Sequence, residues 1–236
     1  MSDKKDCAVL FIHGFLGSPD FFNQFISQIP ENYVVYNMLL CGHGGEVTDF
    51  ANASMKLWKS QVKYTMSVLA EKYNKIAIVA HSMGTFFAME LAAAFPGQVK
   101  ALFLLGSPLK IFVRPIAVTN AAKLLFNLFS EHDYTFLCYK NAVGVRLNMR
   151  FWEYIGWIPR YAELFRESRR ARKTIKKVNV PCYIFQSQHD EVVSIKSIKF
   201  IPEKENIFTT VLKNSSHFIY SDKDFQKIIH SISGIL

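Results

Sequence analysis

Short apolar runs alternate along this chain with segments whose apolar residues recur about every three or four positions. The apolar runs predict buried strands at 7–12, 33–39, 76–80, 99–105, 181–186 and 208–212. The periodic segments predict helices at 19–29, 55–73, 85–95, 194–201 and 225–232. Strands and helices that alternate in this way are typical of an α/β fold, with a mostly parallel sheet flanked by helices.

The alternation stops after Pro108, and no strand is predicted from Leu109 to Val178. This stretch contains a helix with a wide apolar face, formed by Ala121, Leu124, Leu125, Leu128 and Phe129. Further aromatic residues and a basic segment follow. We therefore interpret residues 1–108 and 179–236 as an α/β core and residues 109–178 as an inserted helical cap.

The cap has two interpretations. It either adds to the core or forms a lid that lines an apolar pocket. Its place between two sheet strands, on the side of a serine-containing turn described below, favours the lid.

Composition and charge narrow the class of protein. The chain has 236 residues, which suits one α/β domain with an insertion, and half of them are hydrophobic. The formal charge is +9, and much of the excess lies in Arg166–Lys177. A solvated helix face is the favoured interpretation of that segment, and attraction to an anionic membrane surface is the alternative. Because no aromatic residues interleave with these basic residues, we expect no nucleic-acid partner.

The remaining features indicate a cytoplasmic protein without a metal or cofactor. The cysteines show no C-x-x-C pair and no spacing typical of a disulfide or zinc framework; they are Cys7, Cys41, Cys138 and Cys182. The charged residues at the start are unlike a signal peptide, and no apolar run is long enough to span a membrane. No pair of histidines has metal-ligand spacing with a carboxylate at hand.

One turn carries candidate chemistry. The apolar run at 76–80 ends at His81-Ser82-Met83-Gly84, and a helical pattern then begins. A sharp strand-to-helix turn of this kind exposes a serine hydroxyl and needs small neighbours, here Ala80 and Gly84. A serine nucleophile needs a base within hydrogen-bond reach, and the base needs an acid that orients it.

Candidates for both partners follow later strands. Asp190 comes after the strand at 181–186, and His217 comes after the strand at 208–212. Parallel strands place the loops at their carboxyl ends along one edge of the sheet. We therefore expect Ser82, Asp190 and His217 to meet at that edge as a catalytic triad.

Motifs spread over nearly the whole chain outside the cap carry a family resemblance. They are VLFIHGFLGSP at 9–19, GHG at 42–44, AHSMG at 80–84, GSP at 106–108, QHDEVV at 188–193 and SSHFIYSDKD at 215–224. With them the chain resembles the serine carboxylesterases and monoacylglycerol lipases of the α/β-hydrolase fold. Two positions depart from the usual pattern: Ala80 replaces the first glycine of the turn, and Ser216 stands where glycine often precedes the histidine.

The resemblance implies roles for named residues. It favours Asp190 over its neighbour Glu191 as the acid, because Asp190 has the family spacing ahead of Val192-Val193. It implies that the backbone N–H groups of Phe15 and Met83 form the oxyanion hole. Side chains expected to line the substrate pocket are Phe15, Leu16, Met83, Leu109, Val192 and Phe218.

The other histidines are given structural roles. His13 and His43 are expected to hold loop geometry, and His81 and His189 to serve local structure beside the nucleophile and the acid. His132 and His230 are expected at the surface.

The function implied is hydrolysis of a carboxylic ester through an acyl-enzyme, with an apolar or lipid-like small-molecule substrate. Two alternatives stay open: a monoacylglycerol lipase that contacts membranes through the cap, and a hydrolase-like binding protein with little turnover. Peptidases and C–C bond hydrolases use the same triad. A haloalkane dehalogenase would need an aspartate in place of Ser82.

Overall fold

Six parallel strands form the centre of the structure, a computed structural model that describes residues 5–130 and 132–236. The sheet order is β2-β1-β3-β4-β5-β6, and every neighbouring pair is parallel. The strands are β1 (Lys5–Ile12), β2 (Val34–Met38), β3 (Tyr73–His81), β4 (Val99–Leu105), β5 (Cys182–Ser187) and β6 (Ile207–Leu212). The predicted mostly parallel sheet is thereby confirmed. Residues 1–4 of the predicted core and residue 131 of the predicted cap lie outside the described residues.

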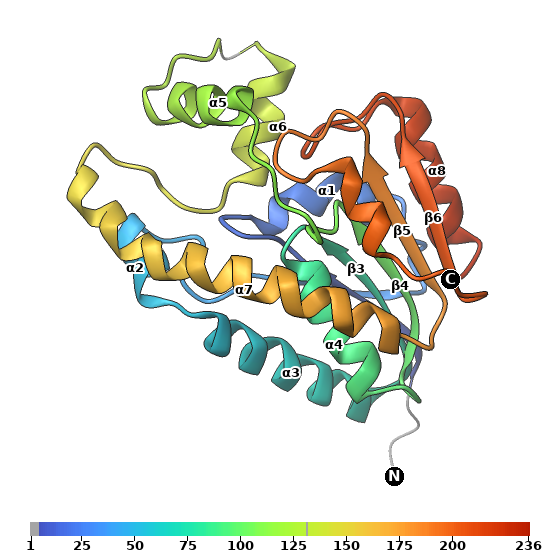
Figure 1. The fold of residues 1–236 in the computed structure, drawn as a ribbon. Coiled ribbons are helices and arrows are strands. Elements are labelled where there is room, and N and C mark those ends of the chain that lie inside the picture. Colours follow the sequence, from blue (N-terminus) through green and yellow to red (C-terminus); the bar gives the residue numbers. More distant parts are fainter. Residues whose placement is uncertain (1–4, 131) are drawn as a thin grey trace.

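Helices cover the sheet and build the cap (Figure 1). The α-helices are α1 (Asn23–Ile26), α2 (Val47–Asn52), α3 (Met55–Lys72), α4 (Gly84–Ala94), α5 (Pro115–Leu125), α6 (Tyr134–Ala142), α7 (Ile158–Thr174) and α8 (Asp222–Ser233). The 3-10 helices are η1 (Pro19–Phe22), η2 (Phe151–Trp157), η3 (Ile175–Lys177) and η4 (Ile195–Phe200).

Both faces of the central strands of the sheet are buried, which explains their apolar runs. Along β1, Val9 and Phe11 belong to a cluster that also contains side chains of η1, α1 and α8. Leu10 and Ile12 point to the other face, into a cluster with side chains of α3, α4 and α7. Successive residues of a strand point to opposite faces, so a strand covered on both sides needs apolar residues throughout.

Several helices differ from the sequence-based expectation. The predicted helix at 19–29 is a 3-10 turn followed by one α-helical turn, although Ser18 caps its start by accepting from the Asp20 N–H. Helix α2 was not predicted. Helix α5 ends at Leu125, and Leu128 and Phe129 are not helical, because Asn127 adopts a left-handed φ of 51° that ends the turn.

Between β4 and β5, the described residues form helices joined by loops, and no strand of the sheet. Three isolated bridges connect these loops to the rest of the described chain: one to the loop after β5 and two to the loops after β1 and β2. Helix α5 has no buried side chain and lies at the outer end of the molecule (Figure 1). Helix α7 instead packs against α3 and α4, and Leu164 and Ala171 reach the main core. Its residues Arg169 and Lys173 are exposed. The boundaries of the cap at 109 and 178 stay a prediction.

Within the described residues, no helix combines the length and apolar character needed to span a bilayer.

A test of the fold lies at Gly84, where α4 starts against β1. A Cβ atom there would lie 2.3 Å from the backbone oxygen of Ile12. Gly84→Ala should therefore lower the free energy of unfolding by about 1–3 kcal/mol or more, since backbone cannot move aside cheaply. Gly97→Ala is the matched control, because nothing lies within 4 Å of its added Cβ. Urea unfolding of both variants makes the comparison, and equal stability would contradict the packing.

Candidate active site

Ser82 sits on a strained turn between β3 and α4. Its φ is 51°, in the left-handed region that residues other than glycine rarely adopt. Two hydrogen bonds hold the turn: the Ser82 N–H donates to the Leu105 carbonyl at 2.8 Å, and the Thr85 hydroxyl donates to the Ser82 carbonyl at 2.7 Å. Strain of this kind persists where surrounding structure fixes it, and it is typical of a serine raised above a sheet.

The loop after β1 lies directly against this serine. A Cβ atom on Gly14 would be 2.7 Å from Ser82 Cβ, so only glycine permits the approach. The next residue, Phe15, has its N–H in this loop, and Met83 precedes the first turn of α4. In the turns, loops and helix ends of the described chain, neither the Phe15 N–H nor the Met83 N–H donates a backbone hydrogen bond. Both groups are thus free to bind an anionic oxygen near the positive end of a helix dipole.

Asp190 and His217 form a buried pair at the carboxyl ends of β5 and β6. The His217 Nδ1–H donates to Asp190 Oδ2 at 2.8 Å. Asp190 Oδ1 accepts from the N–H groups of Val192 at 2.8 Å and Val193 at 2.6 Å. Burial works to lower the pKa of His217, but attraction and hydrogen bonding by Asp190, with the charge of Glu191, together raise it.

The rings of His81 and His217 are neighbours, which places His217 beside the serine turn. Their centroids are 4.6 Å apart, and His81 Nε2 lies 3.0 Å from the His217 carbonyl. Burial and repulsion by His217 lower the pKa of His81 well below its usual value, so a neutral His81 donates this bond. His217 also lies beside Gly106, which follows the Leu105 carbonyl that binds Ser82.

The structure thus gathers Ser82, Asp190 and His217 at one edge of the sheet. The bond between the acid and the base is formed. In the described chain no hydrogen bond joins the Ser82 hydroxyl to His217, so the complete proton relay stays a prediction.

Two further histidines hold the loops around the site. His13 accepts from the Leu40 N–H at Nε2 and bonds to the Gly14 carbonyl at Nδ1. Burial lowers its pKa to about 4, and burial with repulsion by His13 lowers that of His43 to about 3. Both are therefore neutral near pH 7. His13 connects the first loop to the loop after β2, and the His43 ring packs against the His13 ring, with centroids 4.7 Å apart.

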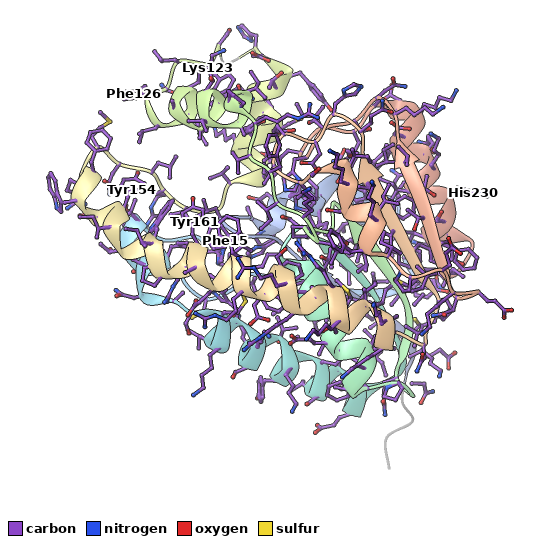
Figure 2. The ribbon with its side chains drawn as sticks, in the orientation of Figure 1. Phe15, Lys123, Phe126, Tyr154, Tyr161 and His230 are labelled. Carbon is purple, nitrogen blue, oxygen red and sulfur yellow. The ribbon has the colours of Figure 1, made fainter. Side chains whose placement is uncertain are left out.

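The two histidines expected at the surface, His132 and His230, are exposed. His189, which was expected to serve local structure beside Asp190, is exposed as well. Figure 2 shows His230 on α8, well away from the cap.

The predicted pocket residues fall into two groups. Phe15, Leu16, Val192 and Phe218 are half-buried around the site. Phe218 contacts the His217 ring, with centroids 4.6 Å apart. The side chains of Met83 and Leu109 are fully buried in the main core. The contribution of all six to substrate binding stays a prediction.

Sequence reasoning missed a second carboxylate that supports the histidine. Glu191 Oε2 accepts from the His217 backbone N–H at 3.0 Å, and Glu191 Oε1 accepts from the Tyr139 hydroxyl at 2.5 Å. The adjacent acids in the sequence were read as rivals, whereas the structure gives each its own bond to His217. No sequence signal linked Tyr139, in the cap, to this loop.

Among the described residues, no group of three or more His, Cys, Asp or Glu side chains could hold a metal ion. The absence of a metal or cofactor stays a prediction.

Comparison with known proteins identifies the family. The family described as alpha/beta hydrolase fold matches residues 8–224. The chain belongs to this α/β-hydrolase family.

Known relatives and structures resemble this α/β-hydrolase over different lengths. A probable lysophospholipase of Arabidopsis thaliana, BODYGUARD 5, is 31% identical over 46% of this chain and 26% of its own length. The chain thus matches about a quarter of that relative. Among solved structures, one from work on the metagenome-derived lipolytic enzymes LipS and LipT has a TM-score of 0.72 to this chain, at 21% sequence identity. The match covers 99% of this chain and 95% of the chain in that structure.

A monoacylglycerol lipase of Paleococcus ferrophilus has a TM-score of 0.68 at 14% identity, over 97% of this chain and 93% of its own. At these identities the structural likeness shows the shared fold.

The pH dependence of serine reactivity tests the Asp190–His217 pair. In the expected triad, neutral His217 accepts the Ser82 proton, and the pKa of His217 is raised. The rate at which a fluorophosphonate labels Ser82 should therefore rise with pH and reach half its maximum above pH 6.5. Asp190→Asn should lower the plateau rate about ten-thousand-fold.

His189→Ala is the matched control, because His189 is an exposed neighbour in the same loop. Its rate and pH profile should match the unmodified protein. Equal labelling of Asp190→Asn would contradict the role of Asp190.

Proposed function

We propose that this α/β-hydrolase is a carboxylic ester hydrolase that uses Ser82, His217 and Asp190 as a triad. His217 Nε2 takes the proton of the Ser82 hydroxyl, and Ser82 Oγ attacks the ester carbonyl carbon. Asp190 holds the histidine and stabilises its cation. The resulting oxyanion is bound by the N–H groups of Phe15 and Met83.

The reaction then proceeds in two stages, release of the alcohol and hydrolysis of the acyl-enzyme. The C–O bond to the alcohol breaks, and the alcohol leaves with the proton from His217. An acyl group remains on Ser82. Water, deprotonated by the same histidine, then attacks the acyl carbon. The C–O bond to Ser82 breaks, His217 returns the proton to Ser82 Oγ, and the acid leaves. The observation that carries the proposal is the buried Asp190–His217 hydrogen bond beside a serine in a strained left-handed conformation.

Aromatic residues above the candidate oxyanion loop support an apolar substrate. The Phe15 ring packs against Tyr161 of α7 and against Phe50, with centroids 4.9 Å apart in each case. Figure 2 shows Phe15 and Tyr161 next to each other. An apolar acyl chain or an aromatic acyl group would be stabilised against such a surface, because its apolar atoms leave water. The lipolytic names of the structural neighbours agree with this substrate class.

Loss of the nucleophile tests the proposed reaction. Ser82→Ala should lower turnover of p-nitrophenyl esters about a million-fold, the scale seen when a triad serine is removed. A panel of esters of increasing acyl length, with monoacylglycerols beside them, would define the substrate. Substantial residual activity in a clean preparation would contradict the assignment.

A binding protein with a slow triad is the alternative from another class. It would be labelled at Ser82 by a fluorophosphonate yet would not turn over simple esters. We place either protein in the cytoplasm, a proposal supported by the four unpaired cysteine thiols.

A second candidate function, a monoacylglycerol lipase at membranes, rests on the exposed surface of the cap. The described chain has 20 exposed large hydrophobic side chains, and 15 of them lie between Phe112 and Phe165. They include Phe126 of the α5 end, which Figure 2 shows at the outer end of the molecule with Lys123. Apolar side chains gathered on one region are typical of a docking surface.

The charge distribution points to an anionic lipid surface as the partner. Residues 109–178 hold 14 of the 28 basic residues but 5 of the 19 acidic ones, so this segment carries the whole excess of +9. The rest of the chain is balanced. Basic residues interspersed with exposed apolar ones favour binding to anionic bilayers.

Vesicle binding tests this candidate. The protein should sediment with vesicles of phosphatidylserine and phosphatidylcholine, and less with phosphatidylcholine alone. Phe126→Ser combined with Lys123→Glu should weaken binding about tenfold or more, since both apolar burial and about 1 kcal/mol of attraction are lost. Tyr64→Ser is the matched control, because Tyr64 is exposed on α3, outside the cap. Equal binding by the cap variant would exclude this surface.

A further inference from the structure

The start of the cap runs alongside the loop that carries the candidate acid. The Phe112 N–H donates to the Val192 carbonyl at 3.0 Å, and the Arg114 N–H donates to the Glu191 carbonyl at 2.8 Å. An antiparallel bridge joins Ile111 and Val193. The cap is therefore attached by backbone hydrogen bonds to the residues that follow Asp190.

Glu191 is a buried carboxylate in this loop that the proposed reaction does not use. Its side chain is 4% exposed, and no cation of the described chain forms a salt bridge with it. Its oxygens instead accept from two donors, the His217 backbone N–H and the Tyr139 hydroxyl. A buried charge without a partner cation is costly, so its presence next to a reactive histidine calls for a functional reason.

Tyr139 connects this carboxylate to the cap. It lies on α6, it is buried, and its hydroxyl accepts from the Asn120 amide of α5 at 3.0 Å while donating to Glu191. Burial, followed by the hydrogen bond to Glu191, raises the pKa of Tyr139, which keeps the phenol protonated as a donor. The Tyr139 ring also packs edge-on against Phe218, the neighbour of His217.

We propose that Glu191 is a positioning residue for His217, and that Tyr139 of the cap holds Glu191 in place. The inference rests on the proposed function of the Ser82 site. Glu191 fixes the backbone of His217 from one side, while Asp190 fixes its ring from the other. A correctly seated cap would thereby align the histidine toward Ser82.

The charge of Glu191 also suits the chemistry. During proton transfer His217 becomes a cation, and a nearby carboxylate stabilises that cation. Among the described residues, three charged or titratable groups face His217: Asp190 and Glu191 from the loop after β5, and His81 from β3. The phenols of Tyr139 and Tyr220 lie close to the two carboxylates. His81 is neutral and both phenols are protonated, so the two carboxylates supply the negative charge.

The rate of Ser82 labelling by a fluorophosphonate, measured against pH, tests this role. Glu191→Gln keeps the size of the side chain and removes its charge. The plateau rate should fall about 10- to 100-fold, the scale of a small misplacement of a catalytic group. Because the negative charge favours protonated His217, its removal should also move the half-maximum to lower pH.

Tyr139→Phe tests the connection to the cap. It should lower the plateau rate by a smaller factor, and it should add nothing in the Glu191→Gln background, because Tyr139 acts through Glu191. Tyr134→Phe is the matched control: Tyr134 lies on the same helix and is exposed, and its variant should label at the normal rate. Circular dichroism and thermal unfolding check that each variant is folded, and Tyr139→Phe carries the test should Glu191→Gln fail to fold.

The outcomes separate the two proposals. A wild-type protein that is not labelled at Ser82 overturns the proposed function and this inference with it. Labelling of the wild type, with Glu191→Gln labelled at the same rate and with the same pH profile, overturns the inference alone. Additive effects of the two substitutions, or an equal loss in Tyr134→Phe, would show a general effect on folding and also overturn it.

Discussion

A buried hydrogen bond between Asp190 and His217 joins two loops that follow neighbouring strands of the sheet. In a solvated loop such a bond would add little, because water competes for both groups. Here both side chains are almost fully buried, and Asp190 is held by two backbone N–H groups. The pairing of these side chains fixes where the His217 imidazole lies relative to the Ser82 turn, and the rest of the candidate site is arranged around it.

The parallel sheet makes this arrangement possible. Its strands end at one edge, so loops distant in sequence meet there without a long connection. Close packing then sets the details: Gly14 brings the first loop against the serine turn, and Gly84 brings the start of α4 against the end of β1. A side chain at either position would clash. His81 fills the space behind His217 and bonds to its carbonyl.

The cap adds a second level of organisation. Its first residues run beside the loop that holds Asp190 and Glu191. Helix α7 packs against α3 and α4, whereas α5 and the adjoining loops leave apolar side chains exposed. One segment thus contacts the candidate catalytic loop on its inner side and carries the excess positive charge of the chain. We propose that this combination links the exposed apolar surface of the cap to the position of His217 through the hydrogen bonds of Tyr139 and Glu191.

Much of this architecture was determined by the sequence alone. All six strands lie at predicted apolar runs, because a strand covered on both faces has few polar positions to interrupt it. The edge strands β2 and β6 are less buried, and they carry Asn37, Thr209 and Thr210 within their runs. The turn at Ser82 and the order of Asp190 and His217 also follow from local residues and chain order.

The internal structure of the cap was beyond such reasoning. Helices α5 and α6 are short, the apolar face of α5 is not buried, and Asn127 ends α5 earlier than periodicity indicated. Only tertiary structure showed that Glu191 supports His217 and that Tyr139 reaches it across 52 residues of chain. Those contacts depend on how the cap seats on the sheet, and long-range packing of this kind leaves no periodic trace in the sequence.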